Sequence, residues 1–270
     1  MTGAAGALLR LVEFGRAGGR PPLILVHPSS GSAFCYAGLA HSLGHDRPVI
    51  GLQAPGFDGE TLPVGRLEDL AALHVAALRE VQPSGPYHIG GWSSGGVTAY
   101  EMARQLVAAG GEVALLALLD STVPAGVPAG SLSEPLARFV EDLAVSAGAH
   151  PPILPAGVAS RPSRDQVEEV EALLREAGLI PPELSRRQLR ARLAVFVASF
   201  RAVHAYRPGP FRGRVVLFEA EGSRHANVRW DAFAHGGMTR VTVPGDHYTI
   251  LRPPYVAWLA DALRSCLGPN

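Results

Sequence analysis

HIGGWSSGGVTAY, residues 88–100, is the stretch that decides the fold. Gly91, Ser93 and Gly95 form a G-x-S-x-G motif between an apolar run that predicts a strand and a pattern that predicts a helix. Such a turn needs residues with almost no side chain beside the serine, and it pushes the serine hydroxyl clear of the sheet. We therefore predict Ser93 as a nucleophile. Ser94 does not fit the motif, because Trp stands at position 92 where it would need Gly.

The same alternation of apolar runs and helical patterns continues on both sides of this motif. Strands are predicted at residues 23–26, 48–53, 87–92, 113–119, 215–220 and 241–243, and helices at 32–44, 66–82, 95–111 and 253–268. Strands that are apolar throughout are typical of a parallel sheet covered by helices on both faces. The expected fold is α/β, a mostly parallel sheet flanked by helices in a single domain over residues 1–270.

One long segment, residues 121–213, interrupts the alternation. It is much longer than an ordinary strand-to-helix connection, and its patterns predict helices at 134–148, 165–178 and 185–206. Two interpretations are open: a helical cap that completes the core, or a lid over a functional site, because long insertions are often lids. The candidate substrate contacts are Trp92 beside the nucleophile and, on the last of these helices, Phe196, Phe200 and His204.

Composition excludes several classes of function. Lys plus Arg and Asp plus Glu number 24 each, so no net charge attracts nucleic acid or an anionic membrane surface. The chain has no apolar stretch of about 18 residues, no export signal and only two cysteines, which favours a cytoplasmic protein with free thiols. It also lacks a glycine-rich phosphate loop and a His/Cys cluster, so no metal or dinucleotide site is expected.

A serine nucleophile needs a base, which is normally a histidine held by a carboxylate. His247 is the leading candidate, because it follows the last predicted strand and precedes the closing helix. His74 and His204 lie on or beside apolar helical faces, where a packed histidine is the more common situation. The remaining alternatives near predicted strand ends are His27, His225 and His235.

Asp120 is the candidate acid, because it ends the strand that follows the nucleophile helix. A turn or cap residue is the alternative interpretation of this aspartate. Asp246 adjoins His247 and suits turn formation better than holding the imidazole. The competing acids around the next strand are Glu219, Glu221 and Asp231.

Acyl transfer also needs hydrogen-bond donors for the oxyanion of the tetrahedral intermediate. The backbone N–H of Ser94, directly after the nucleophile, is the first candidate. The second is expected from the loop HPSSGSAFCY, with Ser29 as the candidate and Ser30 as the alternative. These are backbone roles, so we do not expect the two side chains to be required.

Together these segments resemble the thioesterase domains that end nonribosomal peptide synthetases and some polyketide synthases. VHPSSGSAFCYAGLA resembles the early oxyanion loop, GLQAPGFDGE the second strand and its loop, and VQPSGPYHIGGWSSGGVTAYEMARQL the nucleophile turn. LLDSTVP resembles the acid strand and VPGDHYTIL the histidine loop. The resemblance spans nearly the whole chain and implies an α/β-hydrolase fold with a helical lid at the insertion.

The resemblance also implies roles for five residues. Ser93 corresponds to the acyl-accepting nucleophile, His247 to the base and Asp120 to the acid, and the N–H groups of Ser29 and Ser94 to the oxyanion hole. No cofactor is expected to be bound, because the family receives its substrate on the 4'-phosphopantetheine arm of an upstream carrier domain. GWSSGG and GDHYTIL are more similar to the integrated, product-releasing type than to the stand-alone editing type.

The favoured function is therefore release of an acyl or peptidyl chain from a carrier-bound thioester. Both hydrolysis and macrocyclisation are open outcomes. One alternative is a free-standing serine esterase or lipase. Another is a hydrolase fold that serves as a binding module without catalysis.

Overall fold

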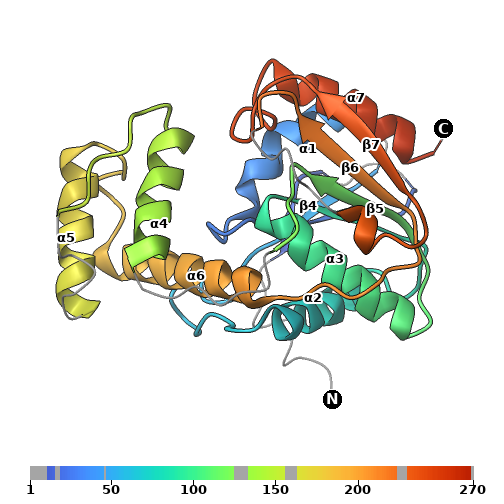
Figure 1. Ribbon diagram of the computed structural model, residues 1–270, viewed down its shortest axis with the longest axis horizontal. Coiled ribbons are helices and arrows are strands. Elements are labelled where there is room, and N and C mark those ends of the chain that lie inside the picture. The colour runs from blue at the N-terminus through green and yellow to red at the C-terminus, as the bar shows by residue number, and fades with distance from the viewer. Residues whose placement is uncertain are drawn as a thin grey trace.

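Seven strands form a single sheet in the computed structural model, which describes residues 11–15, 19–45, 47–124, 133–155, 163–223 and 230–268. The strand order is β1-β3-β2-β4-β5-β6-β7. Neighbouring strands are parallel except for β1, which pairs antiparallel with β3. The predicted mostly parallel sheet with flanking helices is confirmed (Figure 1).

The strands are short and largely buried, as their apolar sequences predict. Residues 11–13 were not expected to form a strand, and the last strand begins three residues earlier than its apolar run, at Met238. The strands are β1 (Leu11–Glu13), β2 (Leu23–Val26), β3 (Val49–Leu52), β4 (Tyr87–Trp92), β5 (Val113–Leu119), β6 (Val215–Ala220) and β7 (Met238–Val243).

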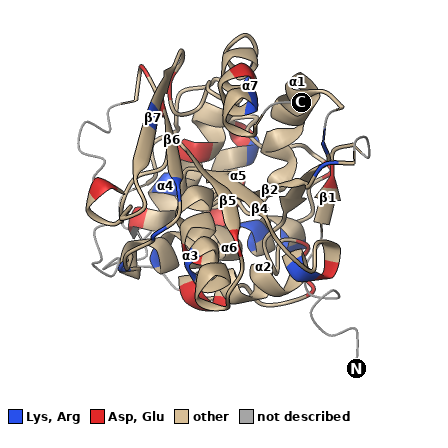
Figure 2. Ribbon diagram, turned by 90° about the vertical axis from the view of Figure 1, so that its right-hand side faces the viewer, with Lys and Arg blue, Asp and Glu red and all other residues tan. Residues whose placement is uncertain are grey.

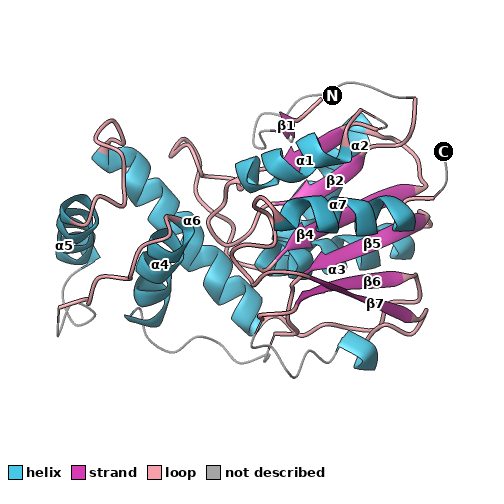
Figure 3. Ribbon diagram, turned by 90° about the horizontal axis from the view of Figure 1, so that it is seen from above, coloured by secondary structure: helices cyan, strands magenta, loops and turns pink. Residues whose placement is uncertain are grey.

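Helices cover both faces of the sheet (Figures 1 and 3). The short helix η1 (Ala33–Tyr36), α1 (Ala37–Leu43) and α7 (Tyr255–Cys266) share one apolar core with the sheet. On the other face, α2 (Leu67–Val81) and α3 (Ser94–Ala108) share a second core with it. Successive strand residues enter opposite cores, as side chains on a strand must: Leu23 and Leu25 join the first, Ile24 and Val26 the second.

Three helices between β5 and β6 form the predicted insertion: α4 (Ser133–Ser146), α5 (Ser163–Glu176) and α6 (Arg186–Ala205). They extend beyond the sheet (Figures 1 and 3) and have an apolar core of their own. Its buried members include Phe139, Val170, Leu174, Leu189 and Phe196. We call these three helices the insertion and the sheet with its flanking helices the body.

The insertion joins the body at two places that are tied by hydrogen bonds. At the exit from β5, Ser121 Oγ donates to the Ser93 carbonyl at 2.7 Å, and the Ser121 carbonyl accepts from Trp230 Nε1 at 2.8 Å. At the return after α6, the Tyr206 hydroxyl donates to Glu101 Oε2 at 2.6 Å. Both ends of the insertion are therefore held on the body.

Charged residues of both signs are interspersed along the face in Figure 2, in agreement with equal numbers of acidic and basic residues. Within the described ranges, no helix is both long and apolar enough to cross a membrane.

Candidate active site

Ser93 lies at a strained turn between β4 and α3. Its φ of 56° is in the left-handed region that residues with a Cβ rarely adopt. The flanking glycines are required by space: a Cβ on Gly91 would lie 2.3 Å from the carbonyl carbon of Gly95, and one on Gly95 would lie 2.3 Å from the Val26 carbonyl oxygen. The Ser93 N–H donates to the Leu119 carbonyl at 3.0 Å. The turn therefore presents the Ser93 hydroxyl at the carboxyl end of the sheet.

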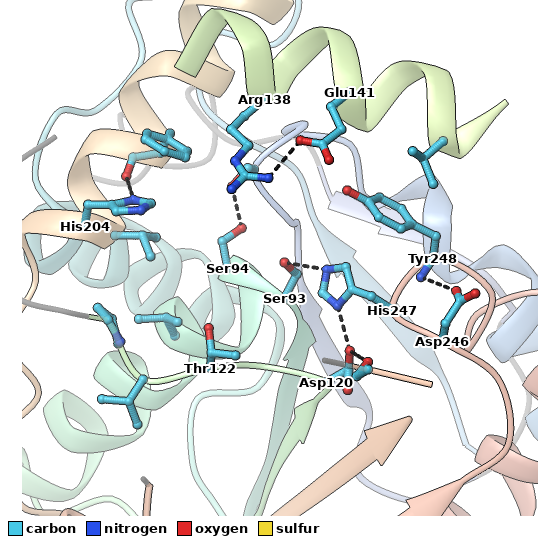
Figure 4. Close-up of a pocket in the computed structure, with 18 of the residues that line it drawn as sticks. Ser93, Ser94, Asp120, Thr122, Arg138, Glu141, His204, Asp246, His247 and Tyr248 are labelled. Atoms are coloured by element: carbon cyan, nitrogen blue, oxygen red, sulfur yellow. Dashed lines mark hydrogen bonds and ion pairs between the residues drawn. The ribbon is translucent and has the colours of Figure 1, made fainter. Parts of the chain in front are cut away.

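His247 bridges Ser93 and Asp120 (Figure 4). Its Nδ1 lies 2.7 Å from Asp120 Oδ2, and its Nε2 lies 3.1 Å from Ser93 Oγ. An ionised carboxylate only accepts hydrogen bonds, so Nδ1 carries the hydrogen and Nε2 presents its lone pair to the Ser93 hydroxyl. The structure thus brings together the three side chains that the sequence analysis selected from three distant segments.

Asp120 is held as an anion by three donors. Besides His247, Ser223 Oγ donates to Asp120 Oδ2 at 2.5 Å and the Ala220 N–H donates to Oδ1 at 3.0 Å. Burial by itself raises the pKa of Asp120, but these hydrogen bonds outweigh it and hold the pKa below its ordinary value. Sequence reasoning missed Ser223, because a serine after a strand carries no signal that distinguishes a carboxylate partner from a turn residue.

The competing acids lie elsewhere. Glu219 and Asp231 form ion pairs with Arg240 at 2.9 and 2.5 Å, and Glu221 is exposed. Asp246 lines the same cavity as His247, but its Oδ1 accepts hydrogen bonds from Tyr248 and Thr249. Asp246 therefore stabilises the turn that carries His247, as its sequence position suggested.

The competing histidines also have other environments. His27 and His74 are buried against each other with ring centroids 5.3 Å apart. Burial lowers the pKa of His27 to about 4 and that of His74 well below its ordinary value, so both rings are neutral. His235 is exposed, and His225 lies outside the described residues.

Two of the four expected substrate contacts need correction. Trp92 is buried and does not line the cavity; its Nε1 donates to the His247 carbonyl at 3.0 Å, and its ring packs 5.0 Å from the imidazole. Adjacent residues leave an extended strand in opposite directions, so the neighbour of the nucleophile faces away from the cavity. Phe196 lies in the core of the insertion, whereas Phe200 and His204 do line the cavity.

The proposed oxyanion donors are the N–H groups of Ser94 and Ser29. Ser94 is the first residue of α3, and Ser29 lies in the loop after β2. No hydrogen bond within the described part of the chain uses the N–H of either residue. Ser29 lines the cavity whereas Ser30 does not, which favours Ser29 as the second donor.

A cavity of about 890 Å³ opens above these groups. Its floor is formed by the body, and α6 contributes an apolar wall with Phe200 and Val203. The roof comes from one face of α4, where Arg138 forms an ion pair with Glu141 at 2.8 Å. A nucleophile, a base with its acid, and two unused N–H donors around one cavity can carry out acyl transfer. Among the described residues no cluster of metal-ligating side chains is found.

The model of the thioesterase domain family matches residues 21–261. The dimodular nonribosomal peptide synthase of Bacillus subtilis (strain 168) is 30% identical over 97% of this chain, which spans 11% of that protein. Chondramide synthase from Chondromyces crocatus is also 30% identical over 97% of the chain, which spans 7% of it. The chain therefore spans only about a tenth of these relatives.

Solved structures of the same kind share the fold. A four-domain nonribosomal peptide synthetase, holo-AB3403 bound to AMP and glycine, matches 96% of this chain with a TM-score of 0.87 and 26% identity, over 20% of its own length. The NocB thioesterase domain, in covalent complex with a fluorophosphonate nocardicin G analogue, matches 97% of the chain with a TM-score of 0.66 and 29% identity, over its full length.

Proposed function

The chain belongs to the thioesterase domain family, and we propose that it releases an acyl or peptidyl chain from a carrier-bound thioester through an acyl-enzyme on Ser93. The observation that carries this proposal is the continuous series of hydrogen bonds from Asp120 through His247 to Ser93 beneath a large cavity. Its relatives are nonribosomal peptide and polyketide synthases, so an upstream carrier domain is the expected partner.

In the first half of the reaction, Ser93 Oγ attacks the thioester carbonyl while His247 Nε2 takes its proton. The negative charge that develops on the carbonyl oxygen is stabilised by the N–H groups of Ser29 and Ser94. Asp120, held ionised by its donors, stabilises the imidazolium that forms. Collapse of the intermediate expels the pantetheine thiolate, which takes the proton from His247, and leaves the acyl chain on Ser93.

In the second half, a nucleophile attacks the acyl-enzyme carbonyl while His247 takes its proton. The ester bond to Ser93 then breaks, and Ser93 Oγ takes that proton back from His247. Water gives the free acid, and a hydroxyl or amine of the acyl chain itself gives a ring. The insertion covers the cavity with the apolar wall of α6, which limits bulk water near the ester. We therefore propose the insertion as a lid that favours an acyl chain folded back on itself.

The proposal is tested by intact-mass detection of the acyl-enzyme. Purified protein is mixed with pantetheine thioesters of candidate acyl or peptidyl chains and with the matched ethyl esters. We expect a mass increase equal to the acyl group, which forms at least tenfold faster from the thioester. Labelling with a fluorophosphonate beforehand should block the increase.

Three results would contradict the assignment. Faster acylation from the ethyl ester would indicate a general esterase. An acyl adduct on protein already labelled by the fluorophosphonate would place the nucleophile elsewhere. A chain that neither accepts an acyl group nor reacts with the fluorophosphonate would be a binding module.

A further inference from the structure

The side-chain hydroxyls of Ser29 and Ser94 form a hydrogen bond with each other that leaves one hydroxyl hydrogen without an acceptor among the described residues. Ser29 Oγ donates to Ser94 Oγ at 2.8 Å, and both residues line the cavity. Each hydroxyl carries a single hydrogen, and their mutual hydrogen bond uses one of the two. No acceptor for the other hydrogen is found in the described parts of the chain. With Ser29 as the donor, the unused hydrogen is that of Ser94.

Arg138 does not provide that acceptor. Its guanidinium points from the α4 roof toward Ser94 (Figure 4), and it donates to Glu141 at 2.8 Å. A guanidinium can only donate hydrogen bonds, so it cannot take the Ser94 hydrogen. Among the described residues, then, the Ser94 hydrogen has no acceptor, and it is available to a molecule in the cavity.

We propose that the Ser94 hydroxyl is a third donor to the oxyanion, beside the N–H groups of Ser29 and Ser94, which revises the sequence-based expectation of a backbone role alone. The hydroxyl and one of those N–H groups belong to the same residue, directly after the nucleophile. Ser29 is a positioning residue, because its hydrogen bond fixes the direction of the Ser94 hydroxyl. No proton leaves Ser94: the Ser93 proton goes to His247, and the carbonyl electron pair moves to the oxygen that Ser94 contacts.

This inference rests on the proposed acyl-enzyme at Ser93, but not on the identity of the leaving group. A suitable test compares p-nitrophenyl acetate with p-nitrophenyl thionoacetate, in which sulfur replaces the carbonyl oxygen. Sulfur is a weak acceptor, so an oxyanion donor contributes little to the second reaction. Both substrates are oxygen esters. A chain that cleaved them but no thioester would refute the thioesterase function and leave this test valid.

For Ser94→Ala we expect kcat on the acetate to fall about tenfold to a hundredfold, with KM within about threefold of wild type. This loss is somewhat smaller than that for removal of a principal oxyanion-hole donor, because the two N–H donors remain. On the thionoacetate the loss should stay under about threefold. Ser94→Thr keeps a hydroxyl and should recover most of the rate. Ser42→Ala, on α1, is the matched control and should behave as wild type.

Ser29→Ala tests the positioning role. Alone it should lower kcat on the acetate by less than Ser94→Ala does. The Ser29→Ala/Ser94→Ala double variant should equal Ser94→Ala within about twofold, because Ser29 acts through the other hydroxyl. A Ser94→Ala variant within twofold of wild type, or one that loses equal rate on both esters with unchanged Tm, would overturn the proposal.

Discussion

The body and the insertion both face the cavity, but their polar groups are held in different ways. In the body, Ser93, Asp120 and His247 are bonded to one another across segments that follow different strands. In the insertion, Arg138 pairs with Glu141 on its own helix, and His204 Nδ1 contacts the Phe200 carbonyl one turn earlier at 2.8 Å. The geometry of the chemistry is therefore fixed by bonds between distant segments of the body, whereas these polar groups of the insertion are bonded within their own helices.

The largest expected effect of a single change in the body is that of Ser93→Ala. It should abolish the acyl-enzyme and lower turnover by about 10⁶-fold, because it removes the hydroxyl that lies 3.1 Å from His247 Nε2. Turnover of a pantetheine thioester and intact mass measure this. Ser265→Ala, an exposed serine on α7, is the control. A stable adduct on the Ser93→Ala protein would show that the body does not hold the nucleophile here.

The next largest effect is expected for Asp120→Asn, with a loss of up to about 10⁴-fold in kcat. The amide no longer stabilises the imidazolium and favours the wrong tautomer of His247. Single-turnover acylation measures the loss, and Tm should change little. Glu221→Gln and Asp231→Asn should remain within threefold of wild type. If one of them were inactive and Asp120→Asn active, the acid would lie after β6.

Much of this body could be predicted from the sequence because its strands are buried on both faces. An apolar run such as Val113–Leu119 can be recognised as a strand without knowledge of its neighbours in the sheet. It is one of four strands whose predicted bounds equal those in the structure. The strand Leu11–Glu13 was missed because three half-exposed residues become a strand only through their pairing with β3. The site followed from the strands, since candidates at successive strand ends meet at one edge of the sheet.

What the sequence could not supply is the direction of individual side chains. Trp92 was expected at the substrate because it adjoins Ser93, although the strand turns its indole toward the His247 loop. Phe196 and Phe200 share a face of α6 and both pack in the core of the insertion. Phe200 lies one turn closer to the end of the helix that returns to the body, and only there does this face also line the cavity.

A smaller effect, on stability, is expected from the buried histidine pair of the body. The folded pKa of His27 and His74 lies below the unfolded value near 6.5, so the unfolded chain binds more protons and stability is lost as pH falls below about 6.5 toward 4. His74→Leu removes one of these groups. Between pH 7.5 and 5 the variant should lose about 2 kcal/mol less than wild type in urea unfolding. An equal loss in both proteins would mean that His74 is protonated in the fold.

The smallest effect is expected for the insertion. Phe200→Asn opens the apolar wall, so it should lower any ring-to-acid product ratio about threefold to tenfold while acylation of Ser93 stays within about threefold. Mass spectrometry of the products measures the ratio. Arg201→Gln, an exposed neighbour on α6, is the control. An unchanged ring-to-acid ratio with a changed total rate would mean that the insertion controls only the entry of substrate to the cavity. If the wild type released only the acid from every substrate, the chain would be a hydrolase.

Because both ends of the insertion are hydrogen-bonded to the body, the whole insertion can be replaced as one continuous segment. Ser121 is fixed to the nucleophile turn and to Trp230, and Tyr206 is fixed to Glu101 on α3, so the body holds both splice points. A chimera that receives another family member's segment between these two residues should keep its reactive centre and acquire a new chamber. Changes in product can then arise by replacement of one continuous segment, with no compensating change in the chemistry beneath it.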